Sequence, residues 1–247
     1  MNEQAKALFD LIGGGLPRTK VTLSCGREIQ MRAFTVKELK LLMMAYTSES
    51  AQDAQIMNVL QQCIITEGVN VETLPSIDVE KMYVAIYSLS RGSNMIPIKF
   101  TCKNKIESEQ GEHTCNKEIL VNMNLGNLDI ENTAIEEIDL DTIVLKMRQP
   151  NVLEMEYFNE TLKDAFNLSM RCVKEVITKD GQKYIVGSDI SVEELAQIVE
   201  MLPPDSLEKI IEFSVNIPTV STKVDVICPN CGHKEQIKMV GLSDLFG

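Results

Sequence analysis

Hydrophobic and polar residues alternate in short runs near the start of the chain and then change to a helical period. Residues 20–23 and 28–32 alternate on either side of a Ser-Cys-Gly-Arg turn, a pattern that predicts a β-hairpin. Thr35 and Glu38 have the spacing of a capping box and predict a helix start, because each can bond the other's backbone amide. The helices of this half are therefore expected at about 35–46, 51–66 and 77–90.

The second half of the chain is expected to follow the same order of strand, helices and hairpin. Residues 142–148 predict a strand, and residues 152–170 predict the helix that follows it. A Lys-Asp-Gly-Gln turn at 179–182 predicts a small hairpin. A second capping box begins at Ser191, and Asp205 is expected to cap the next helix.

These elements predict an α+β fold, a helical body with short β-hairpins. A first helices-plus-hairpin unit is expected at 16–123 and a second at 124–247, packed as one globular body and related by a degenerate internal duplication. Chance resemblance between short Lys-, Glu- and Ile-rich strings is the alternative explanation. Three glycines at 13–15 predict a flexible joint, so residues 1–15, with a short helix at 4–12, are expected to form a mobile N-terminal segment.

The composition is that of a globular protein whose core is built without tryptophan. Hydrophobic residues make up 44% of the 247 residues and aromatic residues only 5%, so Leu, Ile, Val and thirteen Met have to fill the core. Core positions are accordingly expected for Met43, Met44, Met82, Met155 and Met201.

The negative charge is concentrated in one stretch of the chain. The net charge is −12, and residues 124–216 carry nineteen Asp/Glu against eight Lys/Arg. Such a surface opposes phosphate contacts, so no nucleic-acid partner is expected, and it suits docking onto a basic protein. No apolar run approaches the length of a membrane span, and the N-terminus lacks the pattern of a signal peptide. We therefore expect a protein of the cytoplasm with no membrane partner.

The strongest chemical signal is a pair of cysteines near the end of the sequence. Cys228 and Cys231 have the spacing of a zinc knuckle, and Gly232 after them permits the tight backbone turn. In a reducing cytoplasm such a pair indicates metal binding rather than a disulfide. A redox pair is the alternative, and it is disfavoured because a strand rather than a helix is expected to follow the motif.

Cys102 and Cys115 supply an upstream counterpart that an insertion has spread apart. The residues between them, 103–114, are polar and are expected to form an excursion at a hairpin tip. Without this excursion the two cysteines would lie as close together as in a knuckle. Four thiolates are the ligand set of a structural zinc ion, so the predicted metal ligands are Cys102, Cys115, Cys228 and Cys231, in a zinc-ribbon-like clasp. The alternative is that Cys102 and Cys115 are unrelated thiols.

The remaining reactive side chains do not form a recognisable catalytic site. Cys63 and Cys172 lie among apolar residues and are expected in the core, and Cys25 is expected to be a loop thiol. His113 and His233 are expected to be solvated loop residues. The sequence contains no phosphate-binding glycine loop, nucleophile elbow or HExxH motif. We therefore expect no enzyme activity and no small-molecule substrate.

Motifs near both ends of the sequence match a known family. One is Gly-Gly-Gly-Leu-Pro at 13–17, followed by a hairpin and by Arg-Ala-Phe-Thr-Val-Lys-Glu-Leu at 32–39. The other is Cys-Pro-Asn-Cys-Gly at 228–232, followed by a strand and Gly-Leu-Ser-Asp-Leu-Phe at 241–246. In these motifs, and in the order of its elements, the chain resembles the baseplate hub family of T4-like tailed bacteriophages, which includes a hub assembly catalyst.

The resemblance implies a non-enzymatic tail assembly factor. Such a protein would help to build the central hub of the baseplate by binding other tail proteins, hub subunits or the tape measure, in the cytoplasm of the infected bacterium. The acidic stretch 124–216 and the segment 1–15 are the expected contact surfaces. Two alternatives remain: a permanent structural subunit of the hub in the virion, and a zinc-ribbon nucleic-acid-binding viral regulator. The regulator is disfavoured because the knuckle lacks interleaved basic and aromatic residues.

Overall fold

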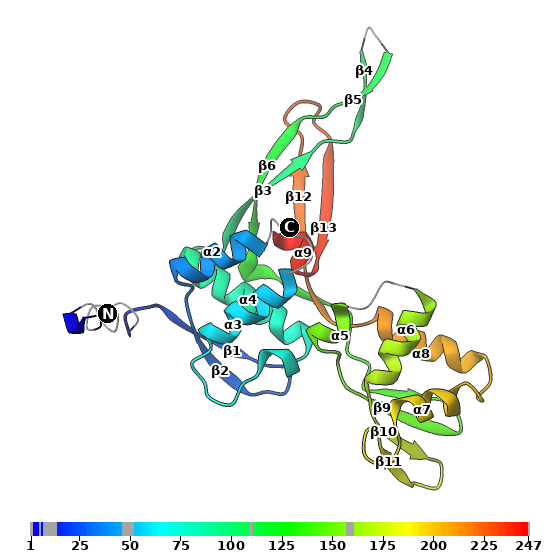
Figure 1. Ribbon diagram of the computed structural model, residues 1–247. Coiled ribbons are helices and arrows are strands. Elements are labelled where there is room, and N and C mark those ends of the chain that lie inside the picture. Colours follow the sequence, from blue (N-terminus) through cyan, green and yellow to red (C-terminus); the bar gives the residue numbers. More distant parts are fainter. Residues whose placement is uncertain are drawn as a thin grey trace. The chain divides into compact units, whose positions relative to one another are not determined.

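In the computed structural model of the protein, the chain forms two compact units (Figure 1). Unit 1 comprises Met1–Val69, Glu80–Asp129 and Val220–Gly247, and unit 2 comprises Asn70–Val79 and Ile130–Thr219. The structure describes residues 2–4, 6, 14–45, 52–108, 111–156 and 161–246. Most of the expected mobile segment 1–15 and of its expected helix lies outside these residues.

The two compact units do not coincide with the two expected sequence halves. The hairpin that carries Cys228 belongs to unit 1, together with the hairpin that carries Cys102. The boundary expected between residues 123 and 124 separates two similar stretches of sequence, whereas the two units are separated by their compactness. The two boundaries describe different properties, so the internal duplication remains a prediction.

Unit 1 begins with the predicted hairpin and capped helix. Strands β1 (Arg18–Thr22) and β2 (Glu28–Arg32) pair antiparallel, and Val21 lies opposite Ile29 on the buried face. The capping box at Thr35 is present, because its hydroxyl accepts from the backbone N–H of Glu38 at 3.4 Å. The helices that follow are α2 (Val36–Ala45), α3 (Gln52–Cys63) and α4 (Ser76–Arg91).

An aromatic cluster joins the last helix, α9 (Gly241–Phe246), to α4 within unit 1. The ring centroid of Phe246 lies 5.0 Å from that of Tyr83, in an edge-to-face arrangement, and 4.7 Å from that of Tyr87. Edge-to-face pairs add to the hydrophobic gain of burial, so this contact fixes the end of the final hairpin against the helical part of the unit.

Two long antiparallel hairpins of unit 1 run side by side, and a smaller one extends beyond them (Figure 1). Residues 103–114 were expected to form an excursion at a hairpin tip, and the described residues of this range pair as the small hairpin. The long hairpins are β3 (Met95–Thr101) with β6 (Glu118–Asn124) and β12 (Thr219–Ile227) with β13 (Lys234–Val240), and the small one is β4 (Lys105–Ser108) with β5 (Gly111–Thr114).

Unit 2 packs helices against an antiparallel sheet of order β11-β10-β9-β8. The expected strand at 142–148 and the expected hairpin around 179–182 are confirmed as β9 and as β10–β11. Its core includes Leu145, Cys172 and Phe213, all buried. The bounds are β8 (Glu137–Asp139), β9 (Ile143–Met147), β10 (Val173–Thr178), β11 (Lys183–Ile185), α5 (Val152–Glu156), α6 (Leu162–Arg171), α7 (Val192–Val199) and α8 (Asp205–Val215). The remaining short elements are η1 (Val71–Thr73), η2 (Leu125–Asn127) and β7 (Asp129–Glu131).

Two sequence expectations for the helices of unit 2 are wrong in detail. The single helix expected at 152–170 is two helices, because Thr161 has extended backbone angles (φ −81°, ψ 152°) and its side chain caps α6 by accepting from the Asp164 amide. Asp205 does not cap α8. It is the first helical residue, and Pro204 occupies the N-cap position, where its ring offers no atom that could accept a hydrogen bond. The capping box at Ser191 is confirmed.

The methionines divide between core and surface, against the expectation that all five named ones fill the core. Met82 is fully buried, whereas Met43, Met44 and Met201 are 63%, 67% and 87% exposed. Helical spacing identifies which residues share a face but not whether anything covers that face. Four exposed apolar residues of α2, here called the α2 face, are Val36, Leu39, Met43 and Met44.

An ion pair between the half-buried Arg32 and the buried Glu38 fixes the junction between β2 and α2. Arg32 donates to both carboxylate oxygens of Glu38, at 2.9 and 2.6 Å, and also to the carbonyl oxygens of Ala33 and Gln62. Burial raises the pKa of Glu38, but hydrogen bonds from Arg32 and Thr35 outweigh this effect and lower the pKa to about 2. The carboxylate is therefore charged and fully paired in the fold.

The same arrangement recurs between β9 and α5. Arg148 donates to both carboxylate oxygens of Glu154, at 2.7 and 2.6 Å, and also to the carbonyl oxygens of Gln149 and Arg171. Asn151 takes the capping role, and the backbone N–H of Glu154 donates to its side chain at 2.9 Å. Burial raises the pKa of Glu154, but its hydrogen bonds outweigh this effect, so the pKa lies below its usual range.

Among the described residues, no helix combines the length and the apolar character needed to cross a bilayer.

Candidate metal site

The final hairpin holds Cys228 and Cys231 in a tight turn between β12 and β13. The backbone N–H of Cys228 donates to the carbonyl of His233 at 2.8 Å, and the N–H of Gly232 donates back to the carbonyl of Cys228 at 2.9 Å. Gly232 has a φ of +70°, a left-handed conformation that glycine adopts without steric cost. The predicted role of this glycine in the knuckle is therefore confirmed.

Cys102 and Cys115 lie in a turn with the same backbone bonds. The N–H of Cys102 donates to the carbonyl of Lys117 at 2.9 Å, and the N–H of Asn116 donates to the carbonyl of Cys102 at 3.0 Å. Asn116 has a φ of +51°, like the glycine of the other turn, and asparagine is one of the few other residues that adopt this region. The N–H of Cys115 bonds the carbonyl of Asn104 at 2.8 Å, which closes the inserted β4–β5 hairpin at its base.

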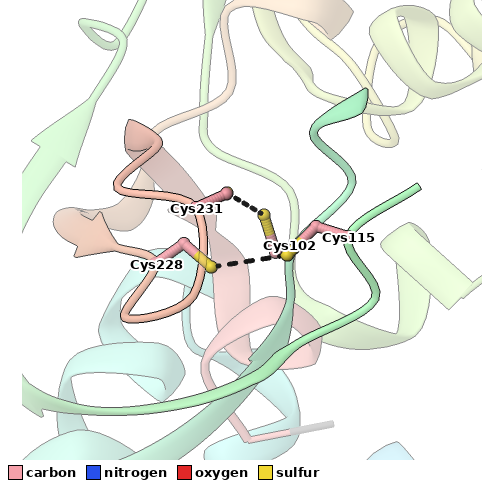
Figure 2. Close-up of side chains that lie close together, drawn as sticks. All are labelled: Cys102, Cys115, Cys228 and Cys231. Atoms are coloured by element: carbon pink, nitrogen blue, oxygen red, sulfur yellow. Dashed lines mark hydrogen bonds between the residues drawn. The ribbon is translucent and has the colours of Figure 1, made fainter. Parts of the chain in front are cut away.

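The four predicted ligands are brought together, and their sulfur atoms all lie within 4.8 Å of one another (Figure 2). Cys102 Sγ is 3.7 Å from Cys231 Sγ, and Cys115 Sγ is 3.7 Å from Cys228 Sγ. A disulfide requires about 2.05 Å between sulfurs. Four sulfurs at about 2.3 Å from a central zinc ion form a tetrahedron with edges of about 3.8 Å, so the group can hold a metal ion.

Two asparagine side chains donate to these sulfurs across the site. The Nδ2 atom of Asn230 lies 3.3 Å from Cys115 Sγ, and the Nδ2 atom of Asn104 lies 3.7 Å from Cys231 Sγ. Each asparagine therefore bonds a cysteine of the opposite hairpin. Neither residue was predicted from the sequence, although each stands two positions after the first cysteine of its hairpin, a repetition that the sequence does contain.

Because the four thiols lie close together, the pKa values of Cys102 and Cys231 shift in opposite directions. The Asn104 backbone hydrogen bond lowers the pKa of Cys102, but burial and the neighbouring thiols outweigh it and raise the pKa to about 12. The pKa of Cys231 is lowered, first by a backbone hydrogen bond from His233 and then by side-chain bonds that include one from Asn104. Without a metal ion, the protons are thus shared unequally, because four thiolates at this spacing would repel one another.

The other cysteines and the histidines lie outside this group, as expected. Cys25 is exposed, whereas Cys63 and Cys172 are completely buried. Burial raises the pKa of each of these two thiols to about 12, so they are inert core residues. Among the described residues, neither His113 nor His233 belongs to the group of potential ligands.

Comparison with known proteins assigns the chain to a family. The profile of the family described as "T4 bacteriophage base plate protein" matches residues 16–247. The chain is 23% identical over 218 residues to the "Baseplate hub assembly protein gp26" of Enterobacteria phage T4, a match that covers 88% of this chain and 92% of that protein. No solved structure matches the chain. Because the family profile spans almost all of the sequence, this protein belongs to the T4 bacteriophage base plate protein family.

Proposed function

We propose that this protein is a non-enzymatic assembly factor for the central hub of a phage baseplate. The observation that carries the proposal is the similarity to the T4 protein named for hub assembly, which extends over 92% of that protein's length. The family profile, which matches residues 16–247, includes residues of both compact units and both cysteine hairpins. The protein would act in the cytoplasm of the infected bacterium by binding hub subunits or the tape measure.

We further propose that the four-cysteine group binds one structural zinc ion. All four positions of a tetrahedral ion would be filled by thiolates, which leaves no position for a water or substrate. The ion would join the β3–β6 hairpin to the β12–β13 hairpin, and thereby hold together segments of unit 1 that are far apart in sequence. Its contribution would be to folding rather than to catalysis.

The repeated ion pairs support an internal duplication. Arg32 and Arg148 each bind a glutamate six positions later, and each donates to the next carbonyl and to the carbonyl before a buried cysteine. Those cysteines are Cys63 and Cys172. These four matching relationships are difficult to obtain by chance, so the two halves are proposed to descend from one ancestral strand-helix-hairpin unit.

The α2 face is the proposed contact surface for a partner. It offers four exposed apolar side chains beside two exposed lysines, Lys37 and Lys40. An amphipathic helix of another tail protein, apolar on one side and acidic at its margin, would complement both features. The acidic stretch 124–216 is a second surface, suited to a basic partner.

Partner capture by tagged protein tests this role. The double substitution Leu39→Asp/Met43→Asp should abolish co-purification of a hub protein co-expressed with the chain, because two buried charges would be left without partners in the interface. Met201→Asp is the matched control, since Met201 is 87% exposed and lies outside α2. Equal capture by both variants would refute the α2 face as the contact surface, and absence of capture by the wild type would refute the assembly role.

A permanent place in the hub is the second candidate, favoured by the family description as a base plate protein. Mass spectrometry of purified phage particles separates the two. An assembly factor should be absent from finished particles, whereas a structural subunit should be present in a fixed ratio to other hub proteins.

A further inference from the structure

We infer that Asn104 and Asn230 are equivalent second-layer residues of the metal site, each stabilising a metal-bound thiolate of the opposite hairpin. The inference rests on the proposed zinc ion. It assigns a role to two residues that contact no metal themselves. They are positioning residues, because they act through the cysteines that they bond.

The first support is the equivalence of the two turns. Two backbone bonds correspond between the turns when one hairpin is exchanged for the other. The bond from Cys102 to Lys117 matches the bond from Cys228 to His233, and the bond from Asn116 to Cys102 matches the bond from Gly232 to Cys228. The two sulfur–sulfur contacts of 3.7 Å are exchanged in the same way. The amide bonds obey the same exchange, since Asn104 bonds the second cysteine of the other hairpin, and so does Asn230. The site therefore has approximate two-fold symmetry that includes the asparagines.

The second support is a sequence motif that the insertion conceals. The final turn reads Cys-Pro-Asn-Cys-Gly at 228–232. When residues 105–114 are set aside, the other turn reads Cys-Lys-Asn-Cys-Asn. The backbone bond between Asn104 and Cys115 places these two residues next to each other at the base of the inserted hairpin, so the shortened motif also describes the structure.

The chemistry of a four-thiolate site explains why such donors would be retained. A divalent ion with four thiolate ligands carries a net charge of two minus, and hydrogen bonds from N–H groups to the sulfurs stabilise that charge. An amide N–H that comes from the opposite hairpin also resists separation of the two halves of the site. Asn230, at 3.3 Å, makes the shorter contact and should contribute more than Asn104, at 3.7 Å.

The test uses the full-length chain with Asn104→Asp and Asn230→Asp. Each substitution keeps the size of the side chain, removes the donor and places a negative charge beside a thiolate. Asn122→Asp is the matched control, because Asn122 is exposed on β6 of the same hairpin. Zinc affinity is measured by competition with a chromogenic chelator, and Co²⁺ substitution gives the thiolate-to-metal charge-transfer spectrum of each protein.

Each Asn→Asp substitution at the site should lower zinc affinity about 10–100-fold, more for Asn230 than for Asn104, and should shift the Co²⁺ charge-transfer bands. The control should match the wild type in both measurements. If the wild type binds zinc and the site variants hold it equally tightly with unchanged spectra, the inference is overturned while the zinc site stands. A wild type that binds no metal overturns both.

Discussion

The Sγ atom of Cys115 lies 3.7 Å from the Sγ atom of Cys228, although 113 positions separate the two residues. Unit 2 is almost entirely encoded between them, so the chain leaves unit 1, builds a second unit and returns to complete the site. A bound metal ion should therefore be a condition for the fold of unit 1. In wild-type protein we expect about one zinc ion per chain by elemental mass spectrometry, and in Cys228→Ser we expect loss of that zinc together with a lower melting temperature. Cys25→Ser, which alters an exposed thiol, should change neither quantity.

The reactivity of the cysteines should follow their surroundings. Alkylation of the native, metal-loaded protein is expected to modify Cys25 first, because it is exposed. Cys63 and Cys172 should resist the reagent, since burial and a pKa of about 12 leave almost no thiolate. The four cluster cysteines should become reactive only when a chelator is added. Site-resolved mass spectrometry measures each rate, and labelling of Cys172 as fast as Cys25 would contradict the packing described here.

The two partly buried Arg–Glu pairs should each stabilise the fold more than a surface pair does. Glu38→Gln leaves Arg32, which is 23% exposed, without its carboxylate, and we expect a loss of about 2 kcal/mol in the free energy of unfolding. Glu154→Gln should cost less, about 1 kcal/mol, because water reaches Arg148, which is 38% exposed. Glu28→Gln is the control, because Glu28 is 59% exposed in its pair with Lys20, and its loss should stay below about 1 kcal/mol. Urea titration followed by circular dichroism measures all three. Similar losses for Glu38 and Glu28 would show that the pair at Arg32 is solvated.

Acid should remove the contribution of Glu38 in a defined pH window. The pKa of its carboxyl falls from 4.5 to about 2 on folding, so the stabilisation is complete above pH 4.5 and is lost as the pH falls toward 2. The stability difference between wild type and Glu38→Gln should accordingly be constant near neutral pH and shrink below 4.5. Comparing the two proteins cancels the acid release of metal, which affects both. A difference that does not change with pH would contradict the assigned pair.

The inserted hairpin should be dispensable for the metal site. Deletion of residues 105–114 joins Asn104 to Cys115, two residues whose backbones already share a hydrogen bond of 2.8 Å. The shortened chain should keep its zinc content and its melting temperature within a few degrees of the wild type. A scrambled hairpin of equal length is the control for effects of expression. Loss of zinc on deletion would mean that the hairpin itself shapes the first knuckle.

Local signals in the sequence were sufficient for most elements and for the grouping of four cysteines. Helix starts were predicted from the capping boxes at Thr35 and Ser191, and hairpins from the turn glycines. Both signals are readable because they depend only on residues close by in the sequence. The cysteines could be grouped because zinc demands four ligands. The break at Thr161 was missed, since an apolar period continues across it.

Features that depend on distant contacts could not be obtained in the same way. The bonds of Asn104 and Asn230 exist only when two hairpins meet, and nothing in either hairpin alone indicates the partner. The exposure of Met43 likewise depends on what lies over α2, which periodicity does not record. The repeated Arg–Glu pairs became visible only when two sets of contacts were compared.

The placement of the ligands also sets the order of events during synthesis. Cys102 and Cys115 leave the ribosome first, while Cys228 and Cys231 follow only after all of unit 2 has been translated. The first knuckle thus offers two of the four thiolates and must wait for the rest. The core of unit 2 is encoded before Cys228, so a bound metal ion would close unit 1 as the final step. A chain that stops before residue 228 would lack two of the four cysteines. Only a chain synthesised past Cys231 could bind the ion with four thiolates.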